Sequence, residues 1–160
     1  MRRLFTTLAL ALGVLASTAG AAQAQVYTLT ASLSGSDETP TINTGAFGNA
    51  TVTLDVGART ITYQISVFNL PSGVTASHIH VGGPSTTGPV IVNFAPPVPA
   101  SNDFGFSGTV AEAQWVMRAD QGIRSGDDVI QALLGGNTYV NVHSTANTGG
   151  EVRGRLTLKP

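Results

Sequence analysis

The chain has 160 residues, with 8 Lys and Arg against 9 Asp and Glu, and only 11% of its residues are charged. A formal net charge of −1 without a cluster of basic residues excludes a nucleic-acid-binding surface, because neutralising phosphates needs a basic patch. The absence of cysteine excludes disulfides, a thiol nucleophile and a lipid anchor on cysteine, so packing alone must stabilise the fold.

Residues 1–24 are predicted to be a secretory signal peptide. Arg2 and Arg3 precede an apolar stretch over residues 4–16, and small residues follow up to Ala24. This order is typical of an export signal, and the apolar stretch is too short to span a membrane stably. We expect cleavage after Ala24 and an exported product, periplasmic or secreted, without a membrane anchor. Residues 25–160 would then form a single domain.

Apolar and polar residues alternate along most of the chain from Val26 onward, which is the pattern of half-buried β-strands. Residues 50–56 and 61–67 are predicted to form an antiparallel hairpin, because a short turn containing Gly57 joins them. The other predicted strands are residues 26–34, 75–81, 89–94, 104–111, 138–144 and 151–158. Eight short strands at this spacing predict an all-β fold, and we expect an antiparallel Greek-key β-sandwich.

One segment has the pattern of a helix rather than of a strand. Ser125 is a suitable N-cap, and two acidic residues follow where the helix dipole favours negative charge. The apolar residues Val129, Ile130, Leu133 and Leu134 recur at helical spacing. A short helix is therefore predicted over residues 126–134, with Gly135 in the C′ position, packed over an edge or an end of the sandwich.

The three histidines are the strongest candidates for chemistry. His78 and His80 flank Ile79 on one predicted strand, so they share a face roughly 7 Å apart at the backbone. His143 ends another predicted strand, on the face opposite Val142. All three are therefore predicted on non-core faces, and three imidazoles in one neighbourhood would suit copper or zinc. The alternative is that they are ordinary half-exposed strand residues, since sequence alone does not make the two strands neighbours.

Other polar residues have two interpretations each. Glu38 precedes Thr39 and Pro40 in a polar turn and is either a carboxylate ligand or a solvated loop acid. Glu151 and Arg153 share a strand face opposite Val152, where they would form an ion-paired strand or lie close to a metal site. No serine lies in a Gly-x-Ser-x-Gly motif, and we predict no catalytic residue.

Three motifs occur in order along the chain. They are LSGSDETP at residues 33–40, HIHVG at residues 78–82, and YVNVHS at residues 139–144 leading into GGEVRG at residues 149–154. Together they resemble the CHRD domain, which is named for chordin and is widespread in exported microbial proteins. The resemblance covers essentially all of residues 25–160 and implies an all-β fold more than an activity. Ser144 stands where such domains often carry threonine.

The same motifs have a distant likeness to copper–zinc superoxide dismutase. By position, His78, His80 and His143 would match copper ligands, and Arg153 would match an arginine close to the metal. The chain lacks the histidine that bridges copper to zinc, the remaining zinc ligands and a disulfide. The likeness therefore implies at most a single metal site, with copper favoured.

Two hypotheses of different classes follow. The first is an exported protein that binds one copper ion through His78, His80 and His143, with Glu38 or water as the fourth ligand. In this hypothesis Glu151 and Arg153 orient the ligands or control access to the metal. The second is a protein-interaction or scaffold module without a metal. A copper-only dismutase at the same histidines is a third, weaker alternative.

Overall fold

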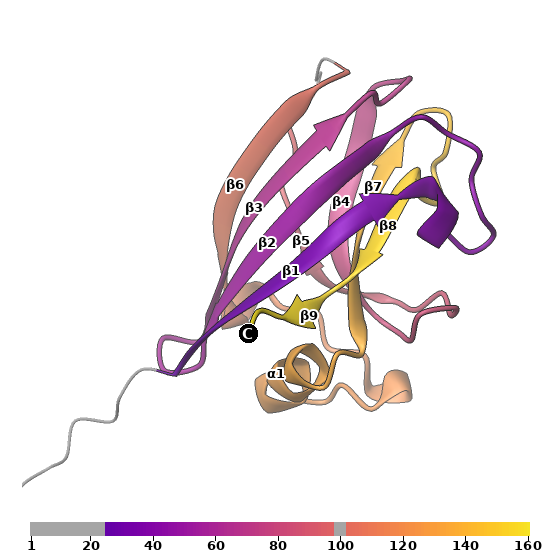
Figure 1. Ribbon diagram of the computed structural model, residues 1–160. Helices are drawn as coiled ribbons and strands as arrows, with labels where there is room; N and C mark the ends of the chain where they lie inside the picture. Colours follow the sequence, from indigo (N-terminus) through magenta and orange to yellow (C-terminus); the bar gives the residue numbers. More distant parts are fainter. Residues whose placement is uncertain (1–24, 98–101) are drawn as a thin grey trace, which may run out of the picture.

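The computed structural model describes residues 25–97 and 102–160 and has the architecture of an antiparallel β-sandwich (Figure 1). The predicted signal peptide, residues 1–24, lies outside the described residues. The strands are β1 (Val26–Ser34), β2 (Phe47–Asp55), β3 (Thr60–Phe68), β4 (Val74–Val81), β5 (Val90–Asn93), β6 (Phe104–Ala111), β7 (Thr138–Ser144), β8 (Val152–Arg155) and β9 (Thr157–Leu158). Helix α1 spans Gly126–Leu134, and short 3-10 turns lie at Gly35–Asp37, Glu112–Gln114 and Ala119–Gln121. Among the described residues, no helix has the length and apolar character needed to cross a bilayer.

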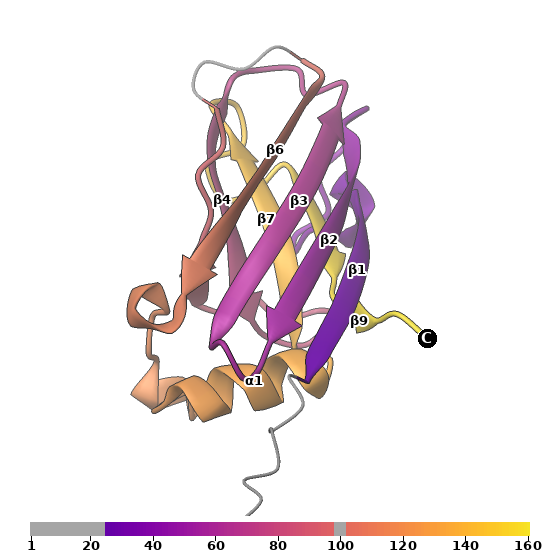
Figure 2. The ribbon, with the colours of Figure 1, turned by 90° about the vertical axis from the view of Figure 1, so that its left-hand side faces the viewer.

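The strands form one hydrogen-bonded path that folds into two facing layers (Figures 1 and 2). The path runs β5-β4-β7-β8-β1-β2-β3-β6, with β9 paired to β1, and every pair is antiparallel. Strands β1, β2, β3 and β6 make one layer and β5, β4, β7 and β8 the other. The β3–β4 and β5–β6 connections cross between the layers, as the expected Greek-key topology requires. The Val116 amide donates to the Ile91 carbonyl at 2.8 Å, so the two ends of the path are bridged and the barrel is nearly closed.

The core lies between the layers and is built from alternate residues of each strand. Val52 and Leu54 of β2 face Ile79 of β4 and Val140 and Val142 of β7, and all five side chains are fully buried. Burial of these apolar side chains is the main driving force for folding in a chain without disulfides. The period of two then places His78 and His80 of β4, Asn141 and His143 of β7 and Arg153 of β8 on the outer face of their layer.

Helix α1 lies across one end of the sandwich, below the strands in Figure 2. The Ser125 hydroxyl accepts from the Asp128 amide, and the Asp128 carboxylate accepts from the Ser125 amide, which is a reciprocal capping box. Val129 and Leu133 are fully buried, as the helical spacing predicted. The C-terminal end differs from the expectation by one residue. Gly135 has a right-handed backbone, and Gly136, with φ of 67°, is the left-handed C′ residue.

Two strands differ from the sequence-based expectation by more than one residue at a boundary. Strand β2 begins at Phe47 rather than Ala50, because its alternation continues through Gly48 as partner of Val67. The expected strand over residues 151–158 is divided at Leu156 into β8 and β9. Up to Arg155 the chain pairs with β7, and beyond the buried Leu156 it pairs with β1 at Thr157 and Leu158.

Candidate metal centre

Adjacent strands β4 and β7 bring the three histidines together on the outer face of their layer. The register places His78 opposite Asn141 and His80 opposite Tyr139, with a shift in the pairing between Val74 and Ala76 that leaves His143 opposite Ala76. One ring nitrogen from each histidine lies within 4.8 Å of the others. The closest pair is Nδ1 of His78 and Nε2 of His143, at 3.1 Å.

Backbone carbonyls determine which nitrogens of two of the rings are available. Nδ1 of His80 donates to the Gly88 carbonyl at 2.8 Å, and Nδ1 of His143 donates to the Thr148 carbonyl at 2.9 Å. Because a carbonyl only accepts, each Nδ1 carries the proton and each Nε2 keeps its lone pair. Nε2 of His80 is buried and has no hydrogen-bond partner. Two imidazoles are therefore held in the tautomer that a metal ligand requires.

The surroundings of the cluster favour neutral imidazoles. Burial, together with the neighbouring His143 and His80, lowers the pKa of His78 to about 4. Burial also lowers the pKa of His80 to about 4, against the effect of its bond to Gly88. The pKa of His143 is lowered by burial as well. Since only the neutral ring binds a metal ion, these shifts keep all three histidines competent at neutral pH.

The structure corrects one expectation about these strands. The alternative of ordinary half-exposed strand residues does not describe His143, which is only 9% exposed on a strand, β7, that is buried along its whole length, whereas His78 and His80 are partly exposed. The loops over residues 82–88 and 145–150 carry the two carbonyls that accept from His80 and His143. The histidine cluster therefore lies under loops rather than on an open strand surface.

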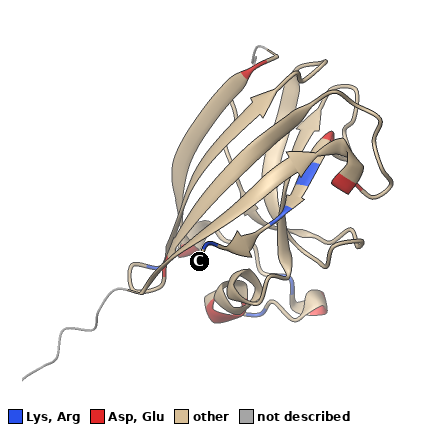
Figure 3. Cartoon of the chain, viewed as in Figure 1, with Lys and Arg blue, Asp and Glu red and all other residues tan. Residues whose placement is uncertain are grey.

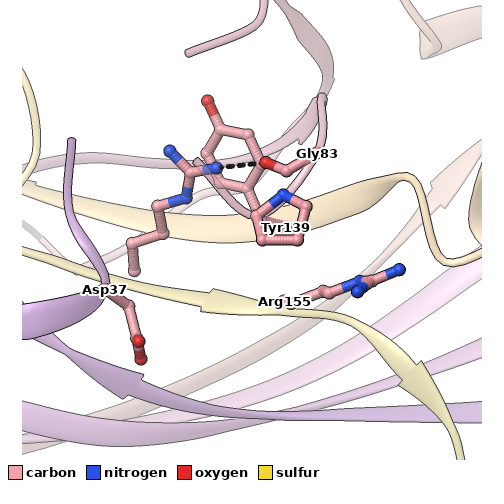
Figure 4. A pocket seen from close by; sticks show the side chains of 6 residues that line it. Asp37, Gly83, Tyr139 and Arg155 are labelled. Atoms are coloured by element: carbon pink, nitrogen blue, oxygen red, sulfur yellow. Dashed lines mark hydrogen bonds between the residues drawn. The ribbon is translucent and has the colours of Figure 1, made fainter. Parts of the chain in front are cut away.

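Arg153 holds the first of these loops. Its Nη2 donates to the carbonyls of Gly83 and Thr86, at 2.8 and 2.9 Å. The guanidinium lies 3.5 Å from the centre of the Tyr139 ring, and that ring is stacked on His80 with centroids 4.9 Å apart and an angle of 7° between the planes. A pocket of about 140 Å³ adjoins this stack (Figure 4) and is lined by Asp37, Gly83, Pro84, Tyr139, Arg153 and Arg155. Arg153 thus supports His80 both through the ring stack and through the loop that carries Gly88.

Glu151 holds the second loop. Its carboxylate, which is fully buried, accepts from the Thr44 hydroxyl at 2.5 Å, from the Ser144 hydroxyl at 2.7 Å and from the Asn147 amide at 2.6 Å. Burial by itself raises the pKa of this carboxyl, but the three hydrogen bonds together bring it below the ordinary value. Glu151 therefore fixes the turn from which Thr148 orients His143.

Glu151 and Arg153 make these contacts with the loops, and they do not form the ion-paired strand that was one interpretation of the sequence. Within the described ranges, the side-chain ion pairs are those of Arg59 with Glu112 and Asp127, and neither involves Glu151 or Arg153. Glu151 accepts from neutral donors and Arg153 donates to carbonyls. Each charged group is therefore stabilised by hydrogen bonds to the loop whose position it fixes.

Glu38 is buried, at 8% exposure, so its interpretation as a solvated loop acid is wrong. Both of its carboxylate oxygens accept from Nδ2 of Asn141, at 2.9 and 3.2 Å. Burial raises its pKa to about 7, against the opposing effects of Arg153 and Asn141. The group of ligand atoms within 4.8 Å of one another consists of the three imidazoles without Glu38. Glu38 as a fourth ligand stays a prediction.

Asn141 and Tyr139 were not predicted as site residues from the sequence, and they share the outer face of β7 with His143. Asn141 pairs with His78 on one side and with Arg153 on the other, and its Oδ1 is buried without a hydrogen-bond partner. Positions 139, 141 and 143 follow the period of two, so Tyr139 and Asn141 could have been predicted on the same strand face as His143 from the sequence. The carbonyls of Gly88 and Thr148 had no comparable signal, because every residue has one.

Comparisons with known proteins return one family. The family model of the CHRD domain matches residues 29–156. No curated protein and no solved structure matches the chain. The likeness to copper–zinc superoxide dismutase is accordingly not borne out.

Proposed function

The chain belongs to the CHRD domain family, and we propose that it is an exported member that binds one metal ion, copper in preference to zinc, through His78, His80 and His143. The observation that carries the proposal is the buried Nε2 of His80, which has a lone pair and no partner in the protein. A buried polar atom without a partner costs free energy, and an ion bound among the three rings would satisfy it.

The donor set supports a borderline transition metal. Three neutral imidazoles, without a thiolate and without a carboxylate in the cluster, suit copper and zinc better than magnesium or calcium. Metal–nitrogen bonds of about 2.0–2.1 Å allow two ligands of one ion to lie up to about 4.1 Å apart. The observed nitrogens lie within 4.8 Å of one another, so small ring rotations would close the site. For one such donor set, copper is bound most tightly of the divalent first-row metals.

The neighbouring residues would orient the ligands. Arg153 and Tyr139 support the ring of His80, and Glu151 fixes the turn that holds His143. Such outer contacts set the tautomer and the direction of ligating histidines. The fourth ligand would be water or the carboxylate of Glu38.

Export is the second part of the proposal. Its support is the basic, apolar and small-residue order of residues 1–24, together with a family typical of extracellular proteins. The test is the N-terminal sequence of the protein recovered outside the cytoplasm, which we expect to begin at Gln25. A product that still begins at Met1 would contradict this part.

The metal proposal is tested by titrating the metal-free protein with Cu(II), with Cu(I) under reducing conditions, and with Zn(II). Bound metal is measured by elemental analysis after removal of free ions. We expect about one copper per chain, displacement of zinc by copper, and loss of binding in a variant with His78→Gln, His80→Gln and His143→Gln. Gln64→Ala, on the opposite layer, is the matched control and should bind as the wild type does.

Absence of binding in the wild type, or equal binding in the triple variant, would contradict the metal proposal. The hypothesis of an interaction module without metal would then stand. Circular dichroism of the triple variant shows whether the sandwich persists, so that lost binding is separated from lost folding.

A further inference from the structure

The outer face of the layer formed by β1, β2, β3 and β6 carries three rows of small uncharged polar residues that run across the strands. One row is Thr28, Thr53, Thr62 and Thr109. The next is Thr30, Thr51, Gln64 and Ser107, and the third is Ser32, Asn49, Ser66 and Gly105. We call these twelve positions the hydroxyl face. Eleven of them carry a hydroxyl or an amide, and each of these groups can both donate and accept a hydrogen bond.

The hydroxyl face has no charged residue, and Figure 3 shows charged residues only near the ends of this layer. A phosphate polymer or an acidic polysaccharide would meet no cation in the rows, and a basic polymer no anion. A lipid surface would meet no basic and no apolar side chain at the twelve positions of the rows. Neutral ligands rich in hydroxyl groups remain, because they can exchange their hydrogen bonds with water for equivalent bonds to these side chains.

The rows are preorganised for such contacts. Six of the twelve residues are threonine, whose branched Cβ restricts χ1 on a strand. The hydroxyls of Thr62 and Thr109 lie 3.0 Å apart across neighbouring strands. Side chains that are already ordered lose little entropy when a ligand binds, which is an advantage for a surface without charge.

Two open hollows lie over the hydroxyl face. One of about 430 Å³ is lined by Thr30, Ser32, Asn49 and Thr51 of the rows and also by Arg155, which lies outside them. The other, of about 170 Å³, includes Gln64, Ser66 and Ser107. They lie over β1–β2 and β3–β6 respectively, so an extended ligand that crosses the strands along one row would contact both.

A pair of exposed, stacked aromatic rings lies beside the rows. Phe47 and Phe68 are cross-strand partners in the row beyond Asn49 and Ser66, and their rings stack with centroids 5.2 Å apart. They are 47% and 36% exposed, which is unusual for phenylalanine. The apolar face of a sugar ring can pack on such rings while its hydroxyl edges bond to neighbouring polar groups.

We propose that the hydroxyl face binds a neutral polysaccharide chain, laid across β1, β2, β3 and β6 along the hydroxyl rows, with Phe47 and Phe68 beside it. This site lies on the layer opposite the histidine cluster and shares no residue with it. The inference is therefore independent of the proposed metal binding.

The test measures retention of the purified protein on insoluble cellulose, chitin and β-1,3-glucan, against an inert matrix and against immobilised heparin and polygalacturonate. We expect retention on at least one neutral polymer and none on the two acidic polymers. The variant Thr51→Ala/Gln64→Ala, which removes the middle of the central row, should bind at least ten-fold more weakly. The variant Asn43→Ala/Thr145→Ala removes one exposed amide and one exposed hydroxyl elsewhere and should bind as the wild type does.

Retention on none of the three neutral polymers would overturn the proposal, as would equal affinity of wild type and the Thr51→Ala/Gln64→Ala variant. The two alanines replace exposed side chains, and unchanged urea unfolding confirms that the variant is folded. The triple histidine variant should keep its retention, which separates this site from the metal centre.

Discussion

Glu151→Ala and Glu151→Gln should destabilise the protein and weaken metal binding by releasing the turn that orients His143. The carboxylate accepts three short hydrogen bonds, from Thr44, Ser144 and Asn147. Hydrogen bonds to charged groups contribute about 1.5–3 kcal/mol each, against about 1 kcal/mol for neutral ones. The single amide oxygen of glutamine can still accept from Ser144 and Asn147, but its amide nitrogen cannot accept from Thr44 and can only donate to that hydroxyl. We therefore expect the free energy of unfolding to fall by about 2–4 kcal/mol.

Alanine leaves the donors without an acceptor in a site where Glu151 is fully buried. Each such donor costs about 1–3 kcal/mol, so the loss for the three donors should be at least about 3 kcal/mol, a large part of the stability of an ordinary domain. Metal affinity of the glutamine variant should fall by about 10–100-fold, as is typical when a contact that orients a ligand is lost.

The assay is urea unfolding of the metal-free protein, followed by the fluorescence of Trp115, the single tryptophan, which is buried. Glu112→Gln is the matched control. It removes a partly exposed ion pair with Arg59 and should cost less than about 1 kcal/mol. A change below about 0.5 kcal/mol in both Glu151 variants, or a metal affinity equal to that of the wild type, would refute the assignment of Glu151 as the residue that holds this turn.

Three further predictions concern pH and packing. Burial raises the pKa of Glu38 to about 7, so the wild type must ionise a buried carboxyl as the pH rises and loses stability, whereas a Glu38→Gln variant does not. The stability of the variant relative to the wild type should therefore be greater above pH 7 than at pH 4.5, by on the order of 2 kcal/mol. A difference between variant and wild type that does not change with pH in urea titrations would contradict this. In the Glu38→Gln background, the metal-free protein should lose stability as the pH falls from 6.5 to about 4. Burial lowers the pKa of His78 and His80 to about 4, so in this range the unfolded chain takes up protons that the folded chain does not. Urea midpoints that stay constant across this range would exclude buried, neutral His78 and His80. Leu54→Ala should lower the free energy of unfolding by about 2–5 kcal/mol, because it leaves a cavity in the core. The folded variant should still bind metal with the stoichiometry of the wild type, since Leu54 belongs to the layer opposite the histidines. Loss of metal binding in the folded variant would show that the two layers are coupled.

The elements of this fold follow closely from local patterns. The period of two over residues 26–34 and 104–111 predicted β1 and β6 to the residue, because each strand has one face in the core and one outside it. The capping residues and helical spacing of residues 125–134 similarly predicted α1. Division of the last strand at Leu156 had no local signal, since both halves keep the same alternation and only their partners differ.

For the site, local patterns were sufficient to select His78, His80 and His143 as outward-facing strand residues, and to single out Glu151 and Arg153 beside them. Whether these residues meet depends on contacts between distant segments: the pairing of β4 with β7, and the return of two loops whose carbonyls accept from His80 and His143. A strand's alternation depends on its own side chains and the position of the core, so the sequence by itself determines the strands and the faces of their side chains. Strand order, the tautomers of the histidines and the burial of Glu38 depend on which backbone atoms of other segments lie opposite, and only the tertiary structure decides them.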